Sequence, residues 1–139
     1  MERIVVGIDG SPAAHEALEW ALDEARRRDA TVEVVLAWHE PFVMGYDYLG
    51  ELDPSAFAGE AEKIIDATIA AVDTTGVTVE HKVIPGRPSQ VLVEEAKGAA
   101  LLVVGSRGRG GFSGLLLGSV SQQASHHSPC PIVIIPAAA

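Results

Sequence analysis

The glycines between positions 105 and 118 are the residues whose spacing most strongly indicates a binding site in this sequence. Six of the fourteen glycines fall there, directly after the apolar run 99–104. Glycine tolerates positive φ and leaves its backbone N–H groups unshielded, so such a loop can fold its amides around an anion. All nineteen acidic residues lie at or before Glu95, whereas Arg107 and Arg109 lie within the stretch. We therefore expect this stretch to bind phosphate.

Composition narrows the class of protein. The chain has 139 residues, 47% of them hydrophobic and 21% charged, which is typical of one globular domain over 1–139. A net charge of −9 argues against nucleic acid or an anionic membrane as partner, because both favour a basic surface. Cys130 is the one cysteine, so no disulfide forms within the chain. No signal peptide or membrane-length apolar run is evident, and we expect a cytoplasmic protein.

Strand and helix patterns alternate along the sequence, and these elements must position the glycine stretch. Strands that alternate with helices predict an open parallel sheet with helices on both faces, an α/β Rossmann-like fold. Ligands bind such sheets beyond the carboxyl ends of the strands, where the direction of strand addition reverses. Glycines mark the ends of the first and fourth strands, so we place the site between them. The expected strands cover 4–8, 31–38, 77–84, 101–104 and 131–135, and the expected helices cover 12–28, 54–75, 89–97 and a segment around 116–124.

The glycine spacing differs from three well-known motifs. No Gly-Lys-Ser/Thr is present, so the stretch is not a Walker P-loop. The dinucleotide fingerprint fails because Ser113 stands where its third glycine belongs. The hydrolase elbow G-x-S-x-G fails because Gly114 follows Ser113 without a spacer. These three classes of nucleotide-binding protein and enzyme are therefore disfavoured.

The spacing that fits is G-x2-G-x9-G-[ST], formed by Gly105, Gly108, Gly118 and Ser119. With this motif the chain resembles the nucleotide-binding branch of the universal stress protein family. The resemblance implies ATP binding and a five-stranded sheet in the order 3-2-1-4-5, of the adenine nucleotide alpha hydrolase-like type. It extends over the whole chain through three further segments: V-G-x-D-G-S at 6–11, Leu-Ala-Trp at 36–38, and C-P-[IV]-x-x-x-P at 130–136.

The resemblance also implies which residues surround the ATP. Gly7 and Asp9 correspond to the end of the first strand, beside the ribose or an associated Mg²⁺. Ala37, or Trp38 if the alignment moves by one residue, corresponds to the position whose backbone pairs with adenine. Arg107 and Arg109 are expected to add charge-assisted hydrogen bonds. The two halves of the phosphate loop correspond to Val104, Gly105, Arg107 and Gly108, and to Gly118, Ser119 and Val120.

Other polar residues have simpler explanations. Asp9 can instead be a turn residue that favours the following helix dipole, and the glycine stretch can be a plain strand-to-helix connection. His126, His127 and Cys130 could suggest zinc. We expect the histidines to mark a helix end and the cysteine a strand start, and we expect no metal-ligand set of protein side chains.

The function implied by the resemblance is that of an ATP-binding regulator of a stress response. The last strand, Pro131 to Pro136, is apolar and is expected at a sheet edge, where its own helices could bury it. The resemblance implies that it instead pairs with a second copy, so we expect a homodimer. No lysine lies in the glycine stretch and no carboxylate follows it, so we expect no catalytic residue. Two alternatives stay open: a slow ATPase or nucleotidyl-transfer enzyme that uses the same pocket, and a dimeric interaction module without a ligand.

Overall fold

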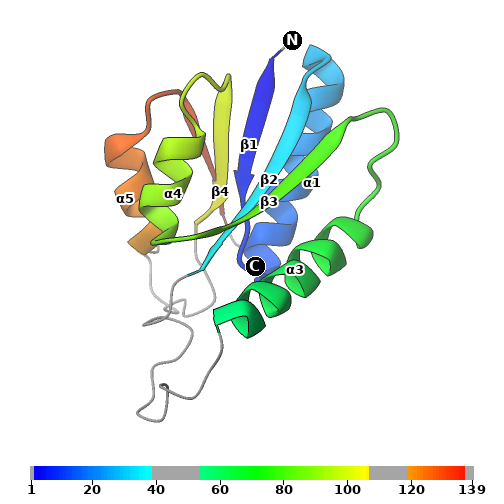
Figure 1. Ribbon diagram of the computed structural model, residues 1–139. Helices are drawn as coiled ribbons and strands as arrows, with labels where there is room; N and C mark the ends of the chain where they lie inside the picture. The colour runs from blue at the N-terminus through cyan, green and yellow to red at the C-terminus, as the bar shows by residue number, and fades with distance from the viewer. Residues whose placement is uncertain (1, 39–53, 107–118, 137–139) are drawn as a thin grey trace.

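The computed structural model describes residues 2–38, 54–106 and 119–136, and Figure 1 shows how they are arranged. Within these ranges, strands and helices alternate as the sequence predicts. Their order is β1 (Arg3–Gly7), α1 (Pro12–Arg28), β2 (Thr31–Trp38), α3 (Pro54–Ala70), β3 (Val79–Pro85), α4 (Pro88–Glu95), β4 (Leu101–Gly105), α5 (Ser119–His127) and β5 (Ile132–Ile135).

The five strands form one parallel sheet in the order β3-β2-β1-β4-β5, which confirms the predicted fold class. Helices α1 and α3 cover one face of the sheet, and α4 and α5 cover the other (Figure 1). After β1 the chain adds β2 on one side, and after β4 it adds β5 on the opposite side. The direction of strand addition therefore reverses between β1 and β4, where the sequence predicts the site.

Both faces of the central strands are buried, which explains their continuous apolar sequences. Ile4 and Val6 of β1 belong to the core beneath α1 and α3. Val5 of the same strand belongs to the core beneath α4 and α5, together with Leu102 and Val104 of β4. One strand therefore stabilises two hydrophobic layers, and β1 and β4 are fixed from both sides.

Helix α1 shows why this sequence folds locally as it does. The Ser11 side chain caps the helix by accepting the Ala14 N–H at 3.2 Å, and Pro12 occupies the first turn. At the other end Asp29 adopts φ 57 and its N–H donates to the Ala25 carbonyl. Apolar residues spaced three or four apart form one face of the helix, and this face is buried: Ala14, Leu18, Ala21, Leu22 and Ala25.

Element boundaries differ from the prediction most clearly around α3 and β3. The helix ends at Ala70 rather than continuing to Thr75, and β3 begins at Val79 rather than Val77. The Asp73 side chain accepts the Thr75 N–H at 2.9 Å, and this local turn competes with the helical hydrogen-bond pattern. As the expected strand order implies, β3 lies at the sheet edge, and Glu80, His81 and Lys82 in it are exposed. None of the described helices combines the length and the apolar character that a membrane span requires.

Candidate functional site

The residues expected around a ligand lie where the strands on either side of β1 extend past its end. Gly7, the last residue of β1, pairs with Val35, and β2 continues to Trp38. On the other side Val6 pairs with Val103, and β4 continues to Gly105. We call this part of the sheet the switch-point edge and define it by Gly7, Asp9, Ala37, Val104 and Gly105.

The main-chain groups of Ala37 face the side of β2 on which β1 has ended. Residues along a strand direct their main-chain groups alternately to its two neighbours. Thr31 donates to the Glu2 carbonyl and Val35 accepts from the Ile8 N–H at 3.0 Å, so the odd-numbered residues of β2 face β1. Ala37 therefore presents an N–H and a C=O beyond the end of β1, and no backbone bond there joins it to another described residue.

Trp38 faces the other way. Its carbonyl accepts the Gly86 N–H at 2.6 Å, which places its main-chain groups on the β3 side. Of the two positions that the sequence leaves open for contact with a base, the backbone geometry therefore favours Ala37.

The two glycines at this edge allow helices to approach the strand ends closely. A Cβ on Gly105 would lie 2.8 Å from the Ala13 Cβ and 3.0 Å from the Ala13 backbone carbonyl. A Cβ on Gly7 would lie 2.5 Å from the Leu92 Cδ1. Both glycines thus have a packing role: Gly105 lets the first turn of α1 lie against the end of β4, and Gly7 accommodates α4.

Asp9 stabilises the turn between β1 and α1. Its Oδ1 accepts, at 2.9 Å, the N–H of Ser11, the residue that caps α1. This is the structural role that the sequence offers as an alternative to ligand binding. A carboxylate accepts up to about four hydrogen bonds, so the two roles are compatible.

Helix α5 begins beside the end of β4. Ser121 is 2% exposed, and its hydroxyl donates to the Ser106 carbonyl at 3.1 Å. This bond joins the first turn of α5 to the residue that follows β4. The Ser106 N–H in turn donates to the Ile135 carbonyl at 2.8 Å. Ser119, with which α5 starts, and Val120 are therefore close in space to Val104 and Gly105. The first turn of a helix offers unpaired N–H groups and a positive dipole end.

The described residues cover part of the predicted phosphate loop. Arg107, Gly108, Arg109 and Gly118 lie outside them, and their predicted contacts stay predictions. Val104 is 3% exposed, with its side chain in the core beneath α4 and α5, so any ligand contact it makes comes from its backbone.

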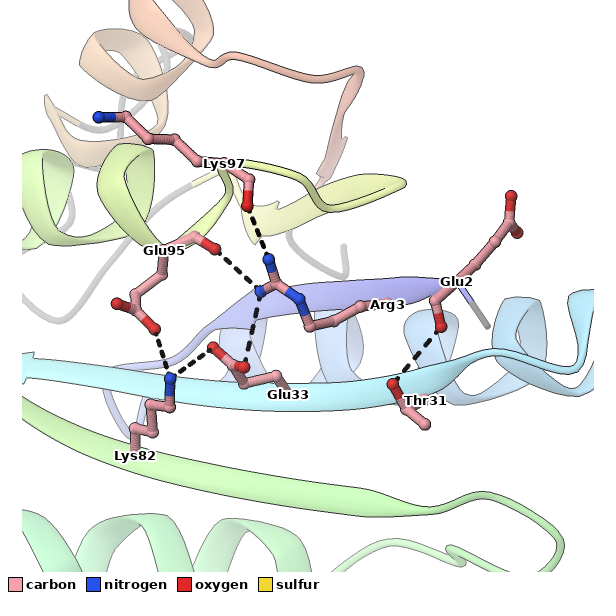
Figure 2. A network of polar contacts seen from close by, with 7 residues as sticks. All are labelled: Glu2, Arg3, Thr31, Glu33, Lys82, Glu95 and Lys97. Carbon is pink, nitrogen blue, oxygen red and sulfur yellow. Dashed lines mark hydrogen bonds and ion pairs between the residues drawn. The ribbon is translucent and has the colours of Figure 1, made fainter.

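A buried carboxylate at the other end of the sheet was not predicted from the sequence. Glu33 of β2 is 5% exposed and lies between Arg3 of β1, 3.5 Å away, and Lys82 of β3, 3.7 Å away (Figure 2). Lys82 also donates to Glu95 of α4 at 3.0 Å. Arg3 donates to the main-chain carbonyls of Glu95 and Lys97 at 2.9 and 2.8 Å. These partners come from four elements far apart in sequence, so spacing alone carries no signal of them.

The ionisation of this cluster follows from burial and pairing. Burial raises the pKa of Glu33 above its ordinary 4.5, in spite of the charges of Lys82 and Arg3. Burial also acts on Glu95, but its hydrogen bond with Lys82 and the nearby cations outweigh it and lower that pKa. The hydrogen bond with Glu95 raises the pKa of Lys82. Perturbed groups can mark active sites, but here the charges are paired among themselves and join α4 to the sheet.

An open cavity of about 660 Å³ lies at the amino edge of the sheet, opposite the switch-point edge. Its charged lining consists of Glu2, Arg3, Arg28 and Asp29. Arg28 already pairs with Glu24 at 2.7 Å, and Arg3 is held by the cluster around Glu33. Its cations are therefore already neutralised, and the cavity offers no concentrated charge to a ligand.

Comparison with known sequences agrees with this arrangement. A model of the universal stress protein family matches residues 1–136. Universal stress protein Rv2005c of Mycobacterium tuberculosis (strain H37Rv) is 40% identical over 133 residues, which cover 94% of this chain and 44% of that relative. The chain thus spans about half the length of the curated relatives it matches.

Solved structures share the fold. The hypothetical protein MJ0577 superposes with a TM-score of 0.84 at 20% identity, covering 99% of this chain and 97% of its own. A universal stress protein in complex with cAMP gives a TM-score of 0.70 at 26% identity, covering 99% and 98%. An Arabidopsis thaliana family protein with AMP bound gives 0.68 at 21% identity, covering 100% and 94%. With the matching family model and the shared fold, this chain belongs to the universal stress protein family.

Proposed function

We propose that this chain binds ATP, together with Mg²⁺, at the switch-point edge and acts as a nucleotide-dependent regulator in a stress response. The observation that carries the proposal is the hydrogen bond between Ser121 and Ser106, 3.1 Å long. It holds the start of α5 against the end of β4, so Gly105 and Ser119, the described ends of the glycine motif, lie at one edge of the sheet. Related structures hold the adenine nucleotides cAMP and AMP, which supports an adenine nucleotide as ligand.

The adenine would pair with the backbone of Ala37. An N–H and a C=O on one residue complement the adjacent acceptor and donor of adenine, whereas guanine presents the opposite pattern there. A site built to hydrogen-bond one base strongly disfavours a base that leaves its groups unpaired. We therefore expect ATP to bind more tightly than GTP.

The phosphates would be held by backbone amides at both ends of the glycine motif. Gly105 and Gly108 supply the first group, and Gly118, Ser119 and Val120 supply the second at the start of α5. Arg107 and Arg109 would add charge-assisted hydrogen bonds. This division of roles follows from the motif and from the position of α5.

The residues present also fit a nucleotide-bound Mg²⁺. Magnesium in proteins keeps several waters and is held by one or two carboxylates plus the substrate phosphates. Asp9 places one carboxylate at the switch-point edge beside Gly7. When bound, the metal would neutralise phosphate charge, while Asp9 would supply one oxygen ligand and hold the turn before α1.

The adenine contact is tested by replacing Ala37 with proline, because proline lacks the N–H and fits an extended strand. The main-chain groups of Ala37 face away from β3, so the β2–β3 pairing is retained. Ala37→Val is the matched control, because valine keeps the N–H and its side chain is similar in volume to that of proline. Calorimetric titration of nucleotide-free protein with Mg-ATP should show at least about fivefold weaker binding for Ala37→Pro than for Ala37→Val. Equal affinity of the two variants would remove Ala37 from the site.

The phosphate contacts are tested in the same titration with Gly108→Val. This variant should weaken binding of ATP while leaving that of adenosine unchanged, because only ATP reaches the phosphate loop. If Gly108→Val binds ATP as tightly as the wild type, the phosphate loop is not where the sequence predicts it.

The oligomeric state is part of the same proposal. We propose a homodimer through β5, whose four residues are half-buried in the single chain. The slow ATPase and the ligand-free interaction module stay alternatives, and the cytoplasmic location stays a prediction. Native mass spectrometry of freshly purified protein separates the ligand-free module from the ATP-binding regulator, because nucleotide carried on the dimer would contradict a ligand-free module.

A further inference from the structure

We propose that Glu62, Asp66 and His81 form a surface site for a divalent transition metal of the Zn²⁺ type, separate from the switch-point edge. Glu62 and Asp66 are four residues apart on α3, so their side chains share one face of the helix. His81 belongs to the edge strand β3, opposite Val34 of β2. Helix α3 packs on β2 and β3, and this packing brings the imidazole to the two carboxylates.

The three side chains have metal-ligand geometry. His81 Nε2 lies 3.7 Å from Glu62 Oε2 and 3.8 Å from Asp66 Oδ1, and one ligand atom from each residue lies within 4.8 Å of the others. Nitrogen and oxygen ligands bind zinc at about 2.0–2.1 Å, so two ligands of a tetrahedral ion lie about 3.3 Å apart. All three residues are exposed, so small side-chain rotations suffice to close this difference.

The donor set indicates the class of metal. Imidazole favours Zn²⁺, Cu²⁺ and Ni²⁺, whereas Mg²⁺ and Ca²⁺ favour sites built from oxygen alone. One imidazole and two carboxylates occupy three positions of a tetrahedral ion and leave the fourth to water. The two carboxylate charges balance those of the ion.

The local charge favours a metal over a simple ion pair. Within the described ranges, no lysine or arginine lies within 4.0 Å of the Glu62 or Asp66 carboxylate. Glu33 and Glu24 differ in this respect, because each has two basic side chains as partners. A single imidazole, even when protonated, leaves one negative charge uncompensated beside it. A divalent ion would remove this excess and would link α3 to the sheet edge.

The test is calorimetric titration of Zn²⁺ into nucleotide-free protein that carries no polyhistidine tag. The wild type should bind one Zn²⁺ per chain, and His81→Gln should weaken the binding at least about tenfold. Glu62→Gln should also weaken it. Glu60→Gln on α3 and the double variant His126→Gln, His127→Gln are matched controls that should bind Zn²⁺ like the wild type. Saturating Zn²⁺ should raise the Tm of the wild type by several degrees and leave that of His81→Gln unchanged.

Two results would overturn the proposal. One is the lack of saturable binding to the wild type below about 1 mM Zn²⁺. The other is equal affinity for the wild type and His81→Gln, with circular dichroism showing that the variant is folded. Because the titration contains no nucleotide, either result leaves the proposed ATP site untouched.

Discussion

At the scale of single residues, the switch-point edge is built from main-chain groups rather than reactive side chains. Gly7 and Gly105 let helices approach, and Ala37 presents an N–H and a C=O. The sequence could predict that these positions lie at strand ends, because apolar runs and the glycines after them are local features, whereas the role of Ala37 was implied by the family resemblance. It could not predict the partners of Glu33 or His81, because three-dimensional packing brings them together from separate elements.

Glu33 gives a pH-dependent prediction. Burial raises its pKa in the folded chain above the ordinary value of 4.5. The contribution of Glu33 to the free energy of unfolding is therefore fully present below pH 4.5 and is lost as the pH rises through the raised pKa. Glu33→Gln cannot lose a proton and should remove this decrease. The free energy of unfolding of Glu33→Gln minus that of the wild type should therefore increase as the pH rises above about 4.5. Glu95 acts in the opposite sense: its pKa is lowered, so the stability that it contributes is lost as the pH falls below 4.5.

Urea unfolding of both proteins between about pH 4 and pH 8 measures this difference. A difference that stays constant over the range would mean that Glu33 ionises alike in the folded and unfolded chains. A difference that decreases with pH would mean that Arg3 and Lys82 outweigh burial and lower the pKa of Glu33.

At the scale of elements, strand order and helix assignment could be predicted from the sequence, but several helix and strand ends could not. The range expected for α1, residues 12–28, matches the structure because its apolar face and its cap are short-range patterns. After α3 ends, Asp73 forms a local turn with Thr75, and a side-chain hydrogen bond of this kind competes with further helix. The position of α5 beside β4 depends on the tertiary hydrogen bond from Ser121 to Ser106.

The contact between α1 and β4 is tested by Gly105→Ala. The new Cβ would meet the Ala13 backbone, which cannot rotate away as a side-chain end can, so α1 must shift. We expect a loss of about 1–3 kcal/mol in the free energy of unfolding, together with weaker ATP binding. Gly59→Ala in α3 is the matched control, because its Cβ would meet nothing within 4 Å. That change should be neutral or stabilise by up to about 1 kcal/mol, as alanine favours helix.

Denaturant unfolding and Mg-ATP titration of these two variants give the answer. Equal stability of Gly105→Ala and the wild type would show that α1 can move at no cost and that the close approach at Gly105 is not required.

At the scale of the whole molecule, the outer edge of β5 is where a second copy would pair. The Leu102 N–H donates to the Pro131 carbonyl and the Ser106 N–H to the Ile135 carbonyl, so odd-numbered residues of this segment face β4. Ile132 and Ile134 therefore direct their N–H groups away from the sheet. The curated relatives are about twice as long as this chain.

Replacing Ile134 with proline should weaken the dimer and leave the fold intact, because proline is tolerated where the N–H faces outward from an edge strand. Ile134→Val, which keeps the N–H, should dimerise like the wild type. Sedimentation equilibrium should show a dissociation constant at least about tenfold higher for Ile134→Pro, the equivalent of about 1.4 kcal/mol. Unchanged dimerisation of Ile134→Pro would move the proposed interface away from β5.

The orientation of Ala37 has a consequence for mutational tolerance. Every residue except proline offers the same N–H and C=O, so an exhaustive substitution series at position 37 should separate into two groups. Variants would differ in stability according to how their side chains fit beneath α4, yet nearly all would still discriminate adenine from guanine. Proline alone should lose that discrimination, and nucleobase choice would thus be encoded in the path of the chain rather than in the identity of an amino acid.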